Sequence, residues 1–286
     1  MNTQFWVVQA FNGISYGALL FLVGSGLSLI FGVMRIVNLS HGAYFLWGGY
    51  IALSVIHATG SWALSLPVAA LAVALIGLLM ERIFLRPLGF DPLRQVLLTV
   101  GFAFLFQQAA LDIWGGNNMD INPPHELTAS VVIGGVYFPL YRMFMIGMAL
   151  LIGLLLWLVM ETTRMGAAVR ATVDDAQMAR GVGIDTSRIS MFIFALGAAL
   201  AAVGGVIGGA FLGIYPGLDF EILPLAFAVV IIGGMGSLGG AAIGALLVGL
   251  ADNFGKALFP EVSYFTLYAP MVLILAIKPT GLFGRE

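Results

Sequence analysis

Long apolar stretches separated by short polar connections form the dominant pattern along this chain. Seven stretches contain no Asp, Glu, Lys or Arg, and most of them approach the roughly 20 helical residues needed to cross about 30 Å of hydrocarbon. A membrane β-barrel would instead show alternating stretches of about 10 residues. The uncharged stretches are residues 1–34, 36–80, 95–111, 143–160, 189–218, 222–251 and 262–277.

This pattern predicts an all-α fold, a polytopic transmembrane helix bundle of about 8–10 spans in which some helices are short or broken. We expect residues 1–286 to form a single transmembrane domain. Residues 1–33 lack the basic start of a cleavable signal peptide and are too long for one, so we interpret them as the first span. The predicted spans are residues 8–34, 42–58, 62–80, 95–113, 143–160, 189–212, 222–235, 238–253 and 263–278.

Orientation follows from the distribution of Lys and Arg, which collect on the cytoplasmic side of short connections. Nine crossings with the N-terminus outside and the C-terminus in the cytoplasm leave only Arg142 and Lys256 outside. Eight or ten spans remain possible if residues 222–253 only dip into the membrane. We expect the bacterial cytoplasmic (inner) membrane, with these residues inside: Arg35, Arg82, Arg86, Arg94, Arg164, Arg170, Arg180, Arg188, Lys278 and Arg285.

Composition supports the membrane assignment and excludes several other classes. Only 9% of the residues are charged, against about 25% in soluble domains. The net charge of −2 offers no basic surface for nucleic acid. The chain has no cysteine, and His41, His57 and His125 lie far apart, so we expect no metal site. Gly255 and Lys256 resemble the end of a P-loop, but Gly249 lies six residues before Gly255 rather than five, and Ala257 replaces the Ser or Thr. We therefore expect no cofactor in this chain.

Two connections are long enough to contain structure of their own. The outer one, residues 115–141, is polar and rich in proline, and is either a partner surface or a passive connector. The inner one, residues 161–188, contains many alanines and ends at Gly181 and Gly183, which predicts a short helix outside the bilayer. From its residues alone, the inner segment is either a docking helix or a plain cytoplasmic loop.

Three motifs give the chain a family resemblance. The pattern RAxxDDxxxARxxGID covers residues 170–185, GVMRIVNLSHG covers residues 32–42, and KPTGLFG covers residues 278–284. In this order, and over nearly the whole chain, they resemble permease subunits of bacterial high-affinity branched-chain amino acid importers of the ATP-binding-cassette class.

The resemblance implies three kinds of partner in addition to membrane lipid. They are a second, homologous permease subunit, two cytoplasmic ATP-binding subunits that hold ATP and Mg²⁺, and a periplasmic substrate-binding protein. It also implies that residues 161–188 dock onto an ATPase and act as a rigid lever on the attached spans. The candidate coupling residues are Arg170, Asp174, Asp175, Arg180, Gly181 and Gly183.

Two polar or glycine-rich breaks interrupt the apolar stretches. Asn38, Ser40 and His41 form the first break, and they either brace it, which we favour, or line a substrate pathway. Gly234, Gly236 and Ser237 form the second, which is either part of the pathway or a tight helical hairpin. Both breaks follow spans that enter from outside, which suggests a parallel internal repeat.

These features predict a permease subunit, rather than an enzyme, for uptake of branched-chain or other neutral amino acids. Urea, short amides and other small polar solutes are the alternative substrates. An ion-driven secondary transporter normally holds ionisable groups inside its spans, and the predicted spans contain almost none. A passive channel fits the low charge but leaves residues 161–188 unexplained.

Overall fold

The computed structural model describes residues 3–89 and 91–284, and most of them are helical. The main helices are α1 (Thr3–Met34), α2 (His41–Thr59), α3 (Trp62–Met80), α4 (Pro92–Trp114), α5 (Leu140–Thr162), α6 (Arg164–Asp174), α7 (Ala176–Gly181), α8 (Thr186–Leu212), α9 (Leu218–Gly233), α10 (Leu238–Leu258) and α11 (Ser263–Ile277). Single turns occur at Glu81–Leu85, Arg86–Leu88, His125–Leu127 and Pro260–Val262, and the strands are β1 (Ser130–Ile133) and β2 (Val136–Pro139).

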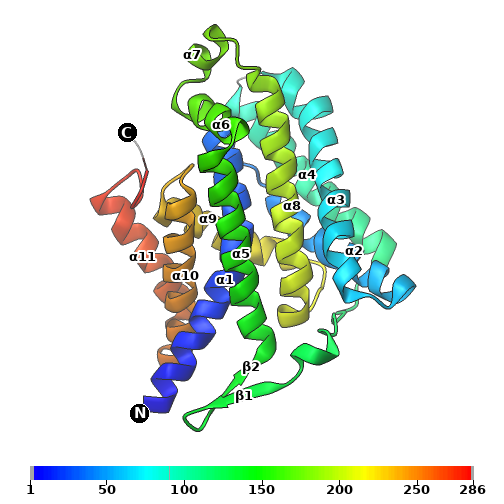
Figure 1. Ribbon diagram of the computed structural model, residues 1–286, viewed down its shortest axis with the longest axis vertical. Helices are drawn as coiled ribbons and strands as arrows, with labels where there is room; N and C mark the ends of the chain where they lie inside the picture. Colours follow the sequence, from blue (N-terminus) through cyan, green and yellow to red (C-terminus); the bar gives the residue numbers. More distant parts are fainter. Residues whose placement is uncertain (1–2, 90, 285–286) are drawn as a thin grey trace.

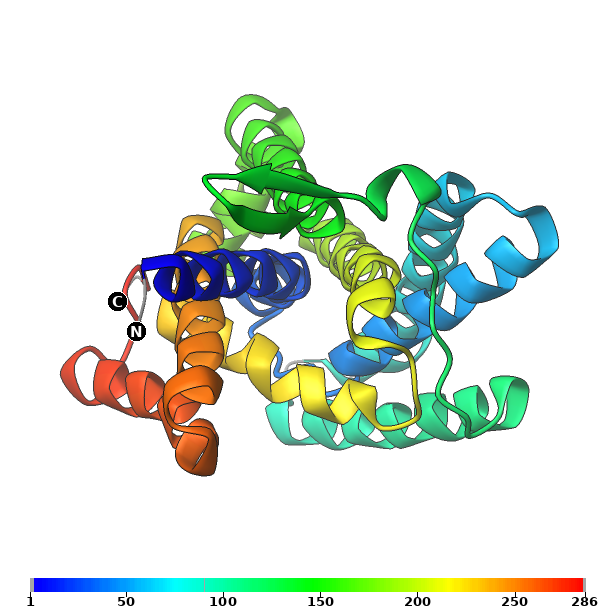
Figure 2. The ribbon, with the colours of Figure 1, turned by 90° about the horizontal axis from the view of Figure 1, so that it is seen from below.

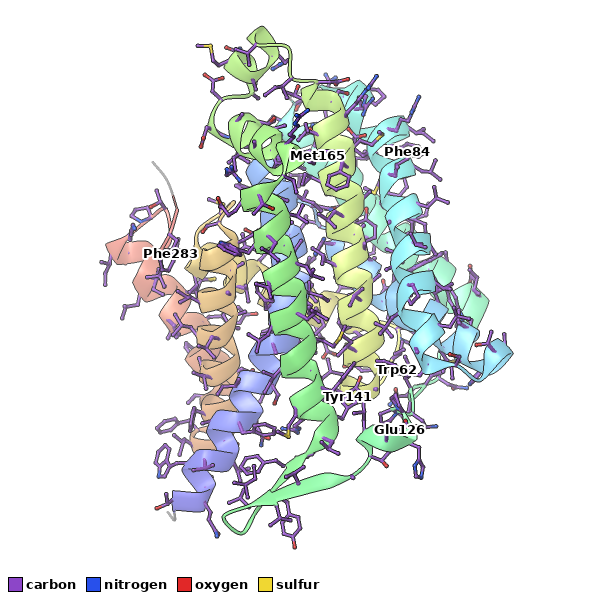
Figure 3. All side chains as sticks on the ribbon, in the orientation of Figure 1. Trp62, Phe84, Glu126, Tyr141, Met165 and Phe283 are labelled. Atoms are coloured by element: carbon purple, nitrogen blue, oxygen red, sulfur yellow. The ribbon has the colours of Figure 1, made fainter. Side chains whose placement is uncertain are left out.

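The helices form one elongated bundle whose two ends differ in character (Figure 1). The coupling end carries α6 and α7, and the hairpin end carries the β1–β2 hairpin and the start of α1. Side chains labelled in Figure 3 locate the other connections: Phe84 and Met165 both lie toward the coupling end, and Trp62 and Tyr141 both lie toward the hairpin end. The connections predicted to be cytoplasmic therefore gather at one end.

Six helices of the described chain are long and apolar enough to cross a membrane: α1, α3, α4, α5, α8 and α10. The helices α2, α9 and α11 supply the shorter elements. The prediction of an all-α polytopic bundle with short or broken helices is therefore confirmed. In the view along the long axis, α9 is seen nearly lengthwise, so it lies strongly inclined to that axis (Figure 2).

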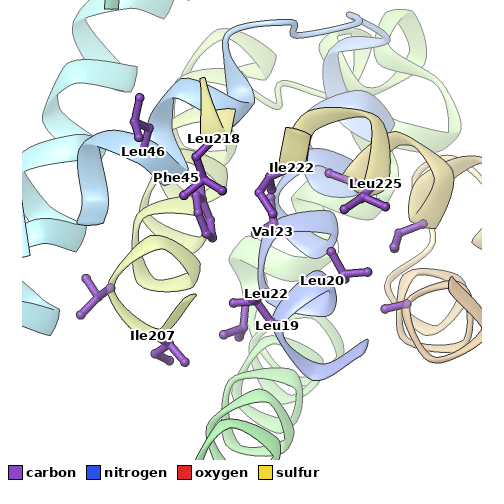
Figure 4. Close-up of a cluster of buried hydrophobic side chains, with 14 of the residues drawn as sticks. Leu19, Leu20, Leu22, Val23, Phe45, Leu46, Ile207, Leu218, Ile222 and Leu225 are labelled. Atoms are coloured by element: carbon purple, nitrogen blue, oxygen red, sulfur yellow. The ribbon is translucent and has the colours of Figure 1, made fainter. Parts of the chain in front are cut away.

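Helix α1 is the centre of the bundle. In its most apolar 18-residue window 78% of the residues are buried, whereas the corresponding value is 22–28% for α3, α4 and α5, which face outward. Its leucines pack against the first turns of α9 and against α2 and α8 (Figure 4). Glycines allow backbones to touch: Gly26 lies against Gly197 of α8, and Gly17 lies against Ala245 of α10.

Helices α2 and α9 begin inside the bundle rather than at its ends. The His41 Nε2 atom lies 3.0 Å from the carbonyl oxygen of Val23, which is eleven residues before the end of α1 and therefore about 16 Å from it along the axis. Gly42 lies against the backbone of Asp219 in the first turn of α9. Both short helices therefore start at a similar depth and contact each other there.

This contact corrects the predicted internal repeat. The break before α2 has its counterpart in residues 213–217, which lead from the hairpin end into α9, rather than in the glycines around Gly236. Because α1 and α8 run in opposite directions, the two units are inverted relative to each other. The sequence did not show this pairing because the depth at which α9 begins is set by its contact with Gly42, which is distant in the sequence.

The outer connection is more ordered than a passive loop. Its β1–β2 hairpin pairs Ser130 with Pro139 and Ile133 with Val136. Before the hairpin, the Met119 N–H donates to the Ile214 carbonyl at 2.8 Å, and the Ile214 N–H donates back at 2.7 Å. The connection is therefore bonded to the segment that leads into α9.

Gly205→Ala provides a test of the close packing between α8 and α2. A Cβ at position 205 would meet the backbone of Phe45 and of Gly49, so helices must move apart, at a cost of about 1–3 kcal/mol. We expect a lower thermal unfolding midpoint for the purified variant in detergent. Gly147→Ala in α5 is the matched control, because its Cβ would meet nothing within 4 Å. Equal midpoints for the two variants would contradict this account of the packing.

Candidate functional site

Helix α6 is anchored to the coupling end of the bundle. The Thr163 hydroxyl oxygen accepts a hydrogen bond from the Gly166 N–H at 3.0 Å and caps the helix. Gly166, Val169 and Thr172 are buried and form the face that packs on the bundle. That face contacts α1, α5 and α8, so a displacement of α6 would act directly on three spans.

The segment contains two short helices and not the single helix predicted. Asp175 adopts an extended backbone, with φ −153° and ψ 104°, between α6 and α7. Its carboxylate accepts hydrogen bonds from the N–H groups of Gln177 at 2.8 Å and Met178 at 3.0 Å. Consecutive Asp residues favour a cap over helix continuation, and this explains why the alanine-rich run breaks there.

The predicted coupling residues lie close together in space. Asp174, Asp175 and Arg180 border one hollow beside the end of α1. Arg170 lies on α6 and forms an ion pair with Glu161 at 3.6 Å. Gly181 ends α7, and Gly183 has a φ of +90°, a value that glycine adopts readily. These glycines stop the helix where the sequence predicts a stop.

Sequence reasoning missed the apolar tip of this segment. Met178 and Val182 are 67% and 73% exposed at the far end of α7, which projects from the bundle (Figure 1). They are four residues apart, a spacing that places side chains on one helical face. Two apolar residues at this spacing, in a helix predicted to lie outside the bilayer, could have indicated an exposed apolar face from the sequence alone.

A cavity of about 700 Å³ lies beneath α6 at the coupling end. Arg35 and Arg170 line it from one side, and Gly236 and Ser237 line it from the other. The structure therefore brings part of the predicted coupling group beside the second break. Arg35 has a φ of +53° and ends α1 abruptly, which turns the chain back into the bundle.

The first break is a buried hydrogen-bonded turn. The Asn38 Oδ1 atom accepts from the Ser40 N–H at 3.1 Å and from the Ser40 hydroxyl at 2.7 Å. His41 bonds to Val23 of α1, as described above. Thr99 of α4 accepts a hydrogen bond from the Leu39 N–H at 3.2 Å. Asn38, Ser40 and His41 are all fully buried, and these bonds occupy most of the polar groups of the break.

The second break is a tight hairpin between α9 and α10. Gly233 lies against Gly240, and Gly236 lies against Gly32 of α1. The Ser237 hydroxyl oxygen accepts from the Gly240 N–H at 3.0 Å and caps α10. Gly234 lies against the C-terminal segment, whose Phe283 N–H donates to the Gly233 carbonyl at 3.0 Å. The break therefore has the shape of a tight hairpin, and its Gly236 and Ser237 also line the cavity beneath α6.

Three carboxylates are buried by the packing of the bundle, and only Asp252 lies within a predicted span. Glu81 is 2% exposed and pairs with Arg86 at 3.1 Å. Asp252 is 7% exposed and pairs with Lys256 at 2.7 Å. Asp219 is 2% exposed.

Six helices long and apolar enough to cross a membrane, short helices that begin inside the bundle and a projecting α6–α7 segment are the architecture of a multi-pass membrane protein. Residues 9–275 match the family model described as branched-chain amino acid transport system / permease component. The chain belongs to that family. No solved structure matches it.

Curated relatives cover nearly the whole chain. It is 30% identical to the high-affinity branched-chain amino acid transport system permease protein BraD of Pseudomonas aeruginosa, over 98% of this chain and 96% of that protein. It is 28% identical to LivH of Escherichia coli, over 100% and 98%. It is also 28% identical to the permease protein LivM of the same organism, over 91% and 67%. The chain is thus similar to two distinct permease proteins with the same system name.

The Asp175 cap predicts that the stability of α7 depends on pH. Hydrogen bonds from the Met178 and Gln177 N–H groups lower the pKa of Asp175 below its ordinary value of 3.8. A lowered pKa in the folded state means that the cap contributes fully above pH 3.8 and is lost as pH falls through the folded value. We expect amide protection of residues 176–181, corrected for intrinsic exchange rates, to be constant at neutral pH and to fall only in acid.

Asp175→Asn is the control for this measurement. Asparagine keeps a capping oxygen and does not titrate, so its α7 protection should not change with pH. Loss of protection in both chains at the same pH would assign the transition to another group.

Proposed function

We propose that this chain is one permease subunit of an ATP-driven importer for branched-chain amino acids. The observation that carries the proposal is the projecting α6–α7 segment in a chain of this family. Its α7 tip exposes apolar side chains to water, while its α6 base packs on three spans. Exposed apolar side chains of this kind mark protein contact surfaces.

The partners follow from the same arrangement. Two cytoplasmic ATP-binding subunits hold ATP and Mg²⁺ and receive α7, because this chain lacks a P-loop. A second, homologous permease subunit completes the pathway, in keeping with the similarity to both LivH and LivM. A periplasmic substrate-binding protein delivers the amino acid to the hairpin end. In this orientation α6 and α7 lie in the cytoplasm and the membrane is the bacterial inner membrane.

Movement would pass from α7 through α6 to α1, and from α1 to the start of α2. The contact between α6 and α1 provides the first step, and the bond between Val23 and His41 provides the last. Asn38, Ser40 and His41 then border the pathway where α2 begins. Gly234, Gly236 and Ser237 border it at the cytoplasmic exit, beside the cavity beneath α6. The motion is a shift of packed helices and needs no change in their secondary structure.

Met178→Ser combined with Val182→Ser tests docking of α7. Removing both apolar side chains should weaken ATPase binding by at least about tenfold, because buried apolar anchors dominate such interfaces. The measurements are the amount of ATPase that co-purifies in mild detergent and the rate of ATP-driven uptake. Val132→Ser with Ile133→Ser is the matched control for ATPase co-purification, since these β1 side chains are similarly exposed at the opposite end. Unchanged co-purification for the Met178 and Val182 variant would remove the docking assignment.

Cysteine labelling tests the orientation independently. The chain has no cysteine, so Met178→Cys and Val132→Cys each introduce a single exposed thiol. A membrane-impermeant maleimide added to intact cells, with a permeable outer membrane, should label position 132 and should label position 178 only after lysis. Labelling of position 178 in intact cells would place α7 outside and contradict the proposed function.

A further inference from the structure

The cavity beneath α6 combines charges of both signs with apolar walls. Four charged residues line it: Arg35, Glu161, Arg170 and Asp174. Apolar side chains of α1 and α5 line another part of it: Leu29, Val33, Trp157 and Met160. Ligand pockets typically pair apolar walls with a few placed polar groups. This lining fits an amphiphile, that is, a molecule with a polar head and an apolar tail.

Arg170 offers a donor that has no acceptor in the described chain. Its Nη1 atom is buried without a hydrogen-bond partner. The distance from Nη1 to Glu161 Oε2 is 3.6 Å, which exceeds the upper limit of about 3.2 Å for an N–H···O hydrogen bond. Arg35 lines the same cavity and has no ion pair with any described residue. Guanidinium groups bind phosphate and carboxylate oxygens strongly, so the cavity presents donors for an oxyanion.

The cavity lies at the depth of the lipid headgroups. Helix α5 has 23 residues and extends about 34 Å, slightly more than the hydrocarbon core of about 30 Å. The last turn of α5, which contains Glu161, therefore reaches the headgroup region. Trp157 lies one turn earlier and is 56% exposed, and tryptophan is enriched at this interface. Phospholipid headgroups are therefore always present beside the cavity.

The carboxylates decide which headgroup fits. Glu161 and Asp174 balance the charges of Arg35 and Arg170, so an anionic headgroup meets repulsion as well as attraction. A zwitterionic headgroup with a primary ammonium uses both signs, because its phosphate accepts from Arg170 and its ammonium N–H groups donate to Glu161. A choline headgroup has the same charges but no N–H donor.

The exposed apolar side chains at the cavity favour a lipid over a free amino acid. Trp157, Met235 and Phe283 line the cavity and are 56%, 45% and 49% exposed. An acyl chain covers such side chains, whereas a free amino acid has the two charges but no comparable tail. The occupant that matches both parts of the lining is therefore a phospholipid.

We propose that the cavity beneath α6 binds a phospholipid with a primary ammonium headgroup, of the phosphatidylethanolamine class, from the leaflet at the coupling end. Its phosphate binds Arg170 and Arg35, its ammonium binds Glu161, and an acyl chain lies against α1 and α5. The site goes beyond the transport function and does not depend on which solute is carried. Because the lipid contacts α1, α5 and α6, it holds the base of the coupling segment on the bundle.

The test is native mass spectrometry of the full-length chain, delipidated in mild detergent and titrated with lipids of identical acyl chains. The lipids are phosphatidylethanolamine, phosphatidylcholine and phosphatidylglycerol. We expect saturable binding of phosphatidylethanolamine, at least about tenfold tighter than binding of phosphatidylcholine, which cannot donate a hydrogen bond to the carboxylate. Phosphatidylglycerol, which is anionic, should also bind more weakly than phosphatidylethanolamine.

Two variants separate the roles of the charged groups. Arg170→Gln should weaken binding of phosphatidylethanolamine by at least about tenfold, because the phosphate loses a charge-assisted hydrogen bond. Glu161→Gln should bring phosphatidylethanolamine and phosphatidylcholine within about twofold of each other and should strengthen binding of phosphatidylglycerol. These are ratios within one folded variant, so a general loss of stability does not imitate them.

Arg94→Gln is the matched control. Arg94 also forms an ion pair with a nearby carboxylate, that of Asp91 at 3.0 Å, but it does not line the cavity. Its affinity for phosphatidylethanolamine should stay within about twofold of the parent.

Three outcomes would overturn the inference. Equal affinities of the parent for the three lipids, unchanged in Arg170→Gln, would show only unspecific lipid around the helices. Tighter binding of phosphatidylglycerol than of phosphatidylethanolamine by the parent would reject the headgroup assignment. Displacement of bound phosphatidylethanolamine by millimolar leucine would assign the cavity to the solute pathway instead. None of these results depends on ATP-driven uptake, so the proposed function is tested separately.

Discussion

Close backbone contact between α1 and its neighbours α8 and α10 is the constraint on which the rest of this structure depends. Lipid tails are as apolar as leucine, so helices in a bilayer gain little from burying apolar side chains and associate through tight packing instead. Gly17, Gly26 and Gly197 remove the side chains that would hold the helices apart. The rigid centre that results gives the short helices a surface against which they can begin in mid-bundle.

Helices that begin inside a bundle need partners for their first backbone groups, because no water is present in the hydrocarbon region to replace them. Before α2 the Leu39 N–H donates to Thr99 and the Ser40 N–H donates to Asn38, while the side chain of His41 bonds to the carbonyl of Val23. Each belongs to a different packed element. The break is therefore stable only while α1, α2 and α4 keep their positions, and it becomes sensitive to any displacement of α1. Because α6 contacts α1, a displacement at the coupling end would reach the break before α2 through α1.

The sequence alone predicted the helix bundle and the end of the bundle at which each connection lies. Both follow from the free-energy cost of placing charges and unpaired backbone groups in lipid. Three-dimensional packing was needed for the rest. The cap at Asp175 competes with the helix-forming alanines around it, and local pattern gave no measure of which would win. Asp219 follows a long uncharged stretch and resembles a residue at a span end. Only the approach of Gly42 from a distant part of the sequence shows that it is buried.

The two-bond bridge between Met119 and Ile214 has an evolutionary consequence. Both bonds join main-chain atoms, so they do not depend on which side chains occupy the outer connection. The side chains of residues 115–141 can therefore diverge while the attachment of this connection to the segment before α9 is preserved.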